Sequence, residues 1–211
     1  PRFSMLETIR EFGLARLAAS DEEAATRDRH AAYYLALVRS LDAWVAAYLP
    51  GAQEILDRLE TEYPNLRAAL AWQRETGDVA GLLDLAANLT FFWQLRGHLR
   101  DGRDWLAWGL AQESAVDAPS FAIGQLALAG VLGALDGAAP GLRWCEASLC
   151  GFLATGDGPN IARAYQQAAA LALSLDDRER TTRYIAAALS ALEALPPTAW
   201  AERAICHVLW T

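Results

Sequence analysis

Apolar side chains in the second half of the chain recur at helical spacing in three segments, residues 83–110, 122–149 and 162–189. The segments align on one template, and their starts are separated by about 40 residues, a period typical of repeated helical units. In each segment a short stretch that favours a turn divides the apolar pattern into two parts of helical length. The pattern therefore predicts three consecutive helix-turn-helix units.

Small residues at equivalent positions predict close contact between the two helices of each unit. With each segment start counted as position 1, positions 20 and 27 are small and position 23 is a large aromatic residue. A small side chain lets a neighbouring helix approach, and a large one fills the gap beside it. Such units bury their apolar faces only by stacking, so we expect an all-α fold, a right-handed α-solenoid. The aligned residues are Gly102, Gly141 and Thr181, then Trp105, Trp144 and Tyr184, then Gly109, Ser148 and Ala188.

The residues before the repeats predict a helical linker region. Two S-x-x-E patterns, at Ser4 and Ser20, have the form of capping boxes, so a helix should begin after each one. The short stretch before Ser4 should end a strand. The second helix should continue towards Tyr48, where Pro50-Gly51 breaks it.

Two more helices are expected before the repeats begin. Residues 52–62 form a short helix, and Pro64 should open the next one, because proline suits the first turn of a helix. Gly77 is a predicted C-cap and Asp78 the following N-cap. Residues 1–78 are therefore assigned to a helical linker region. Residues 79–211 are assigned to about three full units and a truncated fourth at 199–211.

Charge and composition narrow the function. The 211-residue chain has a net charge of −8, and its 18 basic residues are all Arg. Because a phosphate backbone is held by clustered positive charge, we expect no direct contact with nucleic acid.

The apolar run at 121–135 is too short to span a bilayer, so no membrane contact is expected. Three scattered cysteines, Cys145, Cys150 and Cys206, indicate buried free thiols in a reducing cytoplasm.

Five short motifs carry a family resemblance. They are RFSMLETIREF at 2–12, RHAAYY at 29–34, EYPNLRAAL at 62–70, LRGH at 95–98 and GRDWL at 102–106. In this order they resemble a junction in bacterial STAND-class regulators, the AfsR-like and LuxR-like multidomain ATPases with an NB-ARC nucleotide-binding core. The resemblance implies that the first motif closes a winged-helix subdomain and leads into a tetratricopeptide-like sensor region.

The resemblance also implies what lies outside this segment. The chain contains no G-x-x-x-x-G-K pattern, so the nucleotide-binding loop of such a regulator should precede residue 1, and any DNA-binding module should also lie elsewhere. The chain looks like a piece of a longer polypeptide. We therefore expect no cofactor in this segment.

Arrays of this kind usually bind ligands on their concave face, lined by positions 2, 5, 9, 12 and 13 of each first helix. The residues at these positions are Asp84, Ala87, Phe91, Gln94 and Leu95; Ile123, Leu126, Gly130, Gly133 and Ala134; and Arg163, Gln166, Ala170, Leu173 and Ser174. The candidate groove contacts among them are Asp84, Phe91, Gln94, Leu126, Gly130, Arg163 and Gln166. The middle set is small and apolar for a solvated surface. Either residues 5–76 fold into the groove, or an apolar ligand or partner helix occupies it, or the register is wrong.

Tryptophan and histidine give weaker candidates. Trp93 and Trp105 suit either a stacking platform for a planar ligand or knobs within a hairpin, and Trp108 lies off the packing face as a surface candidate. His30 should pack against the preceding helix, and His98 should be solvated or cap a helix. Together with the distant His207 they are too scattered for a metal site.

No pattern of reactive groups suggests catalysis. Asp176-Asp177 beside two arginines indicates helix capping, and Glu60 and Glu62 face different ways. The GDGP stretch at 156–159 can form an anion-binding turn, but a turn between repeats suits it better. We therefore expect no catalytic or metal site and a chain that is not an enzyme.

These observations lead to two functional hypotheses. The first is a cytoplasmic, non-catalytic regulatory segment that binds a protein partner or other domains of its own parent chain. The alternative is binding of a small-molecule inducer in the groove, with Phe91, Gln94, Arg163 and Gln166 as contacts.

Overall fold

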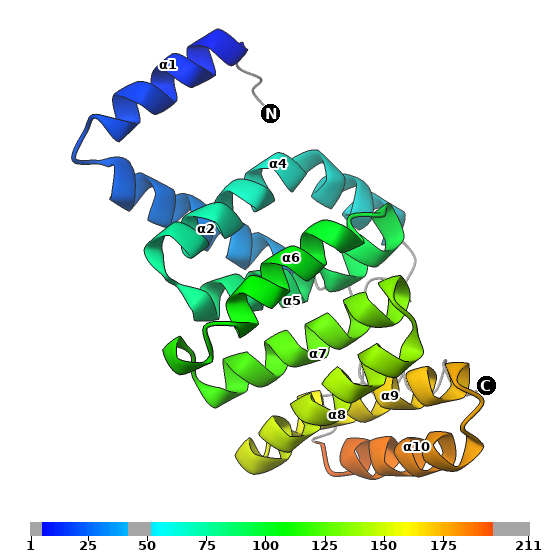
Figure 1. Ribbon diagram of the computed structural model, residues 1–211. Coiled ribbons are helices and arrows are strands. Elements are labelled where there is room, and N and C mark those ends of the chain that lie inside the picture. The colour runs from blue at the N-terminus through cyan, green and yellow to red at the C-terminus, as the bar shows by residue number, and fades with distance from the viewer. Residues whose placement is uncertain (1–5, 42–51, 196–211) are drawn as a thin grey trace.

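The computed structural model describes residues 6–41 and 52–195, and in these ranges the chain is all-α (Figure 1). The predicted helical fold class is therefore confirmed. The predicted strand end, the capping residue Ser4, the break at Pro50-Gly51, Cys206, His207 and the truncated unit at 199–211 lie outside the described residues. The elements are α1 (Glu7–Ala18), α2 (Glu23–Leu41), α4 (Ala52–Thr76), α5 (Val79–Arg96), α6 (Leu99–Leu110), the 3-10 helix η1 (Glu113–Ala115), α7 (Ala118–Leu135), α8 (Ala138–Thr155), α9 (Gly158–Ser174) and α10 (Arg178–Glu193).

Each of the three predicted segments lies within one pair of helices and covers most of it. The pairs are α5–α6, α7–α8 and α9–α10, and the two helices of each pair pack against each other. Successive pairs also touch, because α7 packs on α5 and α6, and α9 packs on α8 and α7. The pairs therefore follow one another in space in the order of the sequence (Figure 1). On the other side of α5, the helices α2 and α4 pack against it.

The predicted close contact within the pairs is confirmed. A Cβ atom added at Gly102 would lie 2.3 Å from the Trp93 ring, and one at Gly141 would lie 2.8 Å from the carbonyl oxygen of Ala129. Gly102 and Gly141 are buried, and Ala188 in the third pair is 0% exposed. Only small residues leave room for such an approach between helices.

Aspartates begin four of these helices and glycines end several of them. The carboxylate of each aspartate accepts a hydrogen bond from a backbone N–H three residues later, which satisfies a donor that the first turn leaves free. The bonds are Asp78 to Gly81 (3.0 Å), Asp117 to Ser120 (2.8 Å), Asp157 to Asn160 (3.2 Å) and Asp177 to Arg180 (2.9 Å). Gly77, Gly97 and Gly156 have positive φ values of 76°, 83° and 71° just after a helix. The predicted caps at Gly77, Asp78 and Asp177 are thus confirmed.

The region around Pro64 differs from the prediction. The sequence predicts two helices on either side of residue 63, whereas α4 runs without interruption from Ala52 to Thr76 with Pro64 inside it. Proline removes one helical hydrogen bond and crowds the preceding turn. On the buried face of α4, however, Leu59, Tyr63 and Leu66 form a continuous apolar stripe at helical spacing. Pro64 itself is exposed to solvent. We infer that burial of the apolar stripe outweighs the free-energy cost of the proline.

The Ser20 side chain makes local hydrogen bonds, but it does not cap a helix in the way that the sequence pattern predicts. The Ser20 hydroxyl accepts a hydrogen bond from the Glu22 backbone N–H at 3.3 Å and donates one to the Leu17 carbonyl at 2.7 Å. It therefore stabilises the turn between α1 and α2, and α2 begins three residues later at Glu23. The first helix begins at Glu7, two residues after the predicted start, and its N-cap Leu6 makes no capping side-chain bond.

Helix α7 is the most apolar element. At 18 residues and a mean hydropathy of 1.6 it is long and apolar enough to cross a membrane by length and composition, unlike the sequence expectation. Its contacts with α5, α6, α8 and α9 account for this composition within the fold. One face contributes Leu128 and Val131 to the core shared with α5. Another contributes Ala122 and Ala129 to the core shared with α8 and α9.

Candidate ligand cavity

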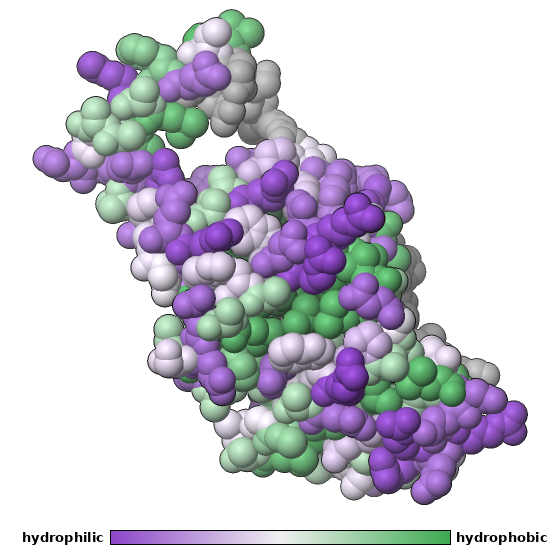
Figure 2. Space-filling model, viewed as in Figure 1, coloured by the Kyte–Doolittle hydropathy of each residue, from purple (hydrophilic) through white to green (hydrophobic). Residues whose placement is uncertain are grey.

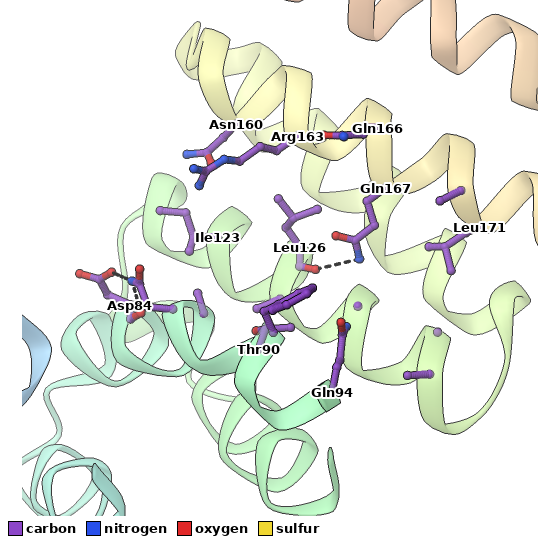
Figure 3. Close-up of a pocket in the computed structure, with 18 residues that line it drawn as sticks. Asp84, Thr90, Gln94, Ile123, Leu126, Asn160, Arg163, Gln166, Gln167 and Leu171 are labelled. Carbon is purple, nitrogen blue, oxygen red and sulfur yellow. Dashed lines mark hydrogen bonds between the residues drawn. The ribbon is translucent and has the colours of Figure 1, made fainter. Parts of the chain in front are cut away.

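A cavity of about 570 Å³ lies between α5, α7 and α9, the first helices of the three pairs (Figure 3). Its volume falls within the ~300–1,000 Å³ range of small-molecule sites. The residues of α5 that line it are Asp84, Ala87, Asn88, Thr90, Phe91 and Gln94; those of α7 are Ile123, Leu126, Ala127, Gly130, Gly133 and Ala134; those of α9 are Asn160, Arg163, Gln166, Gln167, Ala170 and Leu171.

Helical periodicity explains why these side chains share one surface. On α5, Ala87, Phe91 and Gln94 are separated by four and three residues, which places them on one helix face. The opposite face of the same helix carries Leu82 and Leu89, which are 0% exposed in the core. The apolar core therefore fixes the rotation of α5 and turns its mixed face towards the cavity.

All seven candidate groove contacts line the cavity. They are Asp84, Phe91, Gln94, Leu126, Gly130, Arg163 and Gln166. Three other residues that the register placed on the concave face, Leu95, Leu173 and Ser174, are exposed and do not line it. They lie in the last two turns of α5 and α9.

The sequence analysis missed several lining residues. Asn88, Ala127 and Gln167 occupy position 6 of the three units, and all three line the cavity. A polar residue at the same position of two units was the signal that could have found them. Thr90 and Leu171 also line the cavity, and no recurrence at one position of the units marks them.

The cavity is not filled by the described part of the linker region. No residue of 6–41 or 52–76 lines it, so the expectation that these helices fold into the groove is wrong for the described residues. One contact reaches its edge: the Arg39 guanidinium of α2 pairs with the Asp84 carboxylate. The linker helices therefore pack on α5 from the side of the core.

The acidic group of the cavity is already engaged. Besides its pairing with Arg39, Asp84 accepts a hydrogen bond from Asn88 Nδ2 at 2.9 Å through its carboxylate. Asn88 Nδ2 also donates to the Asp84 backbone carbonyl at 2.8 Å. These contacts neutralise the negative charge at the α5 edge of the cavity and hold its side chains in place.

Glycine at position 130 lets two polar side chains reach the floor of the cavity. A Cβ atom there would lie 3.0 Å from Gln94 Nε2 and 3.2 Å from Gln167 Nε2, closer than ordinary contacts. The Gln167 amide donates a hydrogen bond of 3.4 Å to the Leu126 carbonyl (Figure 3). Gln94 and Gln167 therefore approach α7 from opposite walls.

The tryptophan predictions are met in part. Trp93 is 0% exposed and packs against Gly102, and Trp105 is half-buried against the same core, so both act as knobs in the hairpin. Trp108 also packs partly against this core, and the Arg74 guanidinium lies 5.4 Å from the centroid of its ring. It is therefore covered in part, unlike the free surface residue that the sequence indicated.

The histidines lie in aromatic surroundings. His98 is partly exposed but is not a capping side chain: its Nε2 lies 3.1 Å from both Glu60 carboxylate oxygens, and its ring centroid lies 4.2 Å from that of Tyr63. His30 lies 4.7 Å from the Tyr34 ring on its own helix, and burial lowers the pKa of His30. Among the described residues, no group of three His, Cys, Asp or Glu side chains could hold a metal ion.

The remaining candidates have structural partners. Cys145 is buried and its thiol donates to the Ala164 carbonyl at 3.0 Å, but Cys150 is exposed, so the prediction of a buried thiol is wrong there. Glu60 and Glu62 do face different ways, because Glu62 accepts a hydrogen bond from the Tyr34 hydroxyl.

The GDGP stretch and the Asp176-Asp177 pair also have structural roles. The Asp157 carboxylate already occupies the N-terminus of α9, which supports a turn between repeats over an anion-binding turn. The Asp177 carboxylate caps α10, and the hydrogen bond from the Arg180 backbone N–H lowers the pKa of Asp177.

Comparison with known proteins gives partial relatives. No protein-family profile matches the chain. Over 104 residues the chain is 42% identical to proteins of Mycobacterium bovis and Mycobacterium tuberculosis. These relatives are named as HTH-type transcriptional regulators. The match covers 49% of this chain and 11% of each relative, so the chain spans about a tenth of the length of these proteins. The similarity fits a helical region of a transcriptional regulator.

Proposed function

We propose that this chain is a non-catalytic regulatory segment of a multidomain HTH-type transcriptional regulator. The observation that carries the proposal is the cavity, because equivalent positions on the first helices of three successive pairs combine into one concave surface. A surface built in this way suits binding. The similarity to relatives named as transcriptional regulators supports the regulatory context.

The proposed architecture is a right-handed α-solenoid of tetratricopeptide-like hairpins. Stacking of the three helix pairs in chain order supports it, as do the small residues that recur between paired helices. The junction motifs at 2–12 and 62–70 support placing this segment beside the winged-helix subdomain of a STAND-class, NB-ARC-containing regulator. In that arrangement the segment lies in the cytoplasm. It holds no cofactor and contacts neither nucleic acid nor membrane.

The exposed apolar surface of helix α1 supports the proposal that this segment contacts other domains of the parent chain. The helix extends away from the other described helices (Figure 1), and its surface is rich in apolar side chains (Figure 2). Leu6, Ile9 and Phe12 are 72%, 53% and 66% exposed. An apolar surface of this kind marks an interaction site. In the proposed mechanism α1 couples the repeats to the rest of the regulator, and binding in the cavity shifts the balance between its inactive and active states.

Deletion of residues 79–211 from the full-length regulator tests this role. We expect target-gene expression to lose its dependence on the inducing condition, because the segment that receives the signal is gone. Reporter expression with and without induction measures the effect, and an immunoblot checks that protein levels are equal. Unchanged regulation after the deletion would contradict the proposed function.

A second candidate function is the binding of a small-molecule inducer in the cavity. Its volume of about 570 Å³ and its mixture of amide, charged and apolar side chains favour this function. A thermal-shift screen of the 211-residue chain against metabolites tests it, because a ligand that binds only the folded state raises the unfolding temperature. Absence of any specific stabilisation would favour a protein partner.

A further inference from the structure

We propose that the cavity binds a small organic anion, a single carboxylate or phosphate group carried on an apolar body. This inference rests on the proposed function, because it names the ligand class for the same cavity. It is built from the two walls of the cavity, its floor and its size.

The α9 wall supplies the groups that would hold the anion. Arg163 and Gln166 are three residues apart, so they share one face of α9, and both line the cavity. Gln166 is only 4% exposed, and its Nε2 has no hydrogen-bond partner among the described residues. An unsatisfied buried donor is costly, and a ligand oxygen would satisfy it.

The guanidinium group of Arg163 suits the same anionic group of the ligand, because it is positively charged and donates hydrogen bonds. Its planar set of N–H donors pairs with both oxygens of a carboxylate or phosphate, which gives a strong and directional contact. Figure 3 shows Arg163 extending from α9 on the side of the cavity opposite Asp84 and Thr90. Among the described residues that line the cavity, Arg163 is the only cation. One anionic group therefore suits this wall.

The α5 wall does not favour a cationic ligand. In the part of the chain that the structure describes, Asp84 is the only acidic residue that lines the cavity, and its carboxylate already pairs with Arg39 and Asn88. A cationic ligand group would have to compete with a guanidinium for this carboxylate.

The floor and the size of the cavity define the body of the ligand. Phe91, Ile123 and Leu126 supply apolar surface for it. The cavity volume of about 570 Å³ lies within the range of small-molecule sites, so a compact molecule suits it.

Matched pairs of anionic and neutral probes test the proposal on the 211-residue chain. The pairs are 3-phenylpropionate with 3-phenylpropionamide, octanoate with octanamide, and phenyl phosphate with phenol. We expect at least one anion to raise the unfolding temperature and to bind in calorimetry at least about tenfold more tightly than its neutral partner. The carboxylate and phosphate arms show which anionic group the cavity prefers.

Variants then locate the binding site. Arg163→Gln should weaken binding of that anion by at least about tenfold, and Arg163→Lys should retain part of the affinity because it keeps the charge. The matched control is Arg178→Gln, since the Arg178 side chain is 90% exposed on α10 and does not line the cavity. Circular dichroism checks that each variant folds.

Three results would overturn the anion proposal: no binding by any anion, equal binding of anions and neutral partners, or equal loss of affinity in Arg163→Gln and Arg178→Gln. Any of these outcomes leaves the deletion experiment on the full-length regulator unaffected. Failure of the ligand class is thus distinguishable from failure of the regulatory role.

Discussion

Gly141 illustrates how single residues determine the packing of this chain. Its α-carbon faces the backbone of α7, where the Ala129 carbonyl oxygen and the Gly133 α-carbon would lie 2.8 Å and 2.9 Å from an added Cβ atom. Backbone atoms cannot rotate away as a side chain can. A glycine in this position allows α7 and α8 to touch, and the sequence indicated it because the same position is small in the other two units.

Gly141→Ala should destabilise the chain by about 1–3 kcal/mol, because the methyl group forces α7 and α8 apart. The control is Gly13→Ala in α1, where nothing lies within 4 Å of an added Cβ atom. There the change should be neutral or slightly stabilising, since alanine favours a helix more than glycine does. Urea unfolding followed by circular dichroism measures both. Equal stability of the two variants would contradict the close contact.

Cys145 should make stability depend on alkaline pH. Burial, with a smaller contribution from the Glu146 charge, raises the pKa of its thiol from 9.0 to about 12. The unfolded chain therefore releases this proton at a lower pH than the folded chain. Below pH 9 the group has no effect. Between pH 9 and about 12 the free energy of unfolding should fall by about 1.4 kcal/mol per pH unit for this group.

Urea unfolding at a series of pH values between 8 and 11 measures this slope in wild type and in Cys145→Ala. We expect the variant to show the shallower decline, although Tyr63, whose pKa is also raised by burial and by its hydrogen bond to Asp101, contributes in both proteins. Parallel slopes would show that the thiol ionises as readily in the folded chain as in the unfolded one.

The candidate site shows what residue patterns can and cannot predict. The register of the repeats was enough to place Asp84, Gln94 and Arg163 around one cavity, because each first helix turns the same face inwards. Contacts between different elements were not predictable in this way. The pairing of Arg39 with Asp84 and of His98 with Glu60 joins residues 45 and 38 positions apart, and no periodicity encodes such distances.

At the scale of helices, the sequence predicted the three pairs well. The apolar spacing, the N-cap aspartates and the glycines that follow the helices all indicate the same helix boundaries. Helix α4 is the exception. Local preference favours a new helix at Pro64, but the buried stripe continues through it, and tertiary packing overrides the local signal. Patterns that depend on the partner surface, such as the half-buried position of Trp108, were likewise outside the reach of the sequence.

Pro64→Ala should stabilise the chain by about 1–3 kcal/mol, because it restores a backbone N–H inside α4 and removes the ring from a crowded turn. Pro64 is exposed, so the change should not disturb the core. Pro119, at the start of α7, is the control, because an N–H in the first turn has no helical partner. Thermal unfolding measures both variants. A Pro119→Ala gain equal to that of Pro64→Ala would contradict an uninterrupted α4.

At the scale of the whole molecule, the core and the cavity lie on opposite faces of the same helices. Helices α2 and α4 cover one face of α5, while its other face, with α7 and α9, borders the cavity. The sequence left open whether the linker region fills the groove, because that depends on the direction in which α2 and α4 leave the repeats. In the described residues they leave the cavity accessible, and this arrangement is the basis of the proposed regulatory role.

The most direct test fills the cavity in the full-length regulator. Ala170 is exposed at the cavity wall, so Ala170→Trp should occupy the space without disturbing the core, and Ala186→Trp on the exposed face of α10 is the matched control. The measurement is the ratio of target-gene expression under inducing and non-inducing conditions. We expect this ratio to fall to about one in Ala170→Trp and to stay unchanged in Ala186→Trp, as loss of effector binding removes the differential affinity that drives the switch. An unchanged ratio in Ala170→Trp, with the protein folded and equally abundant, would contradict the role of the cavity.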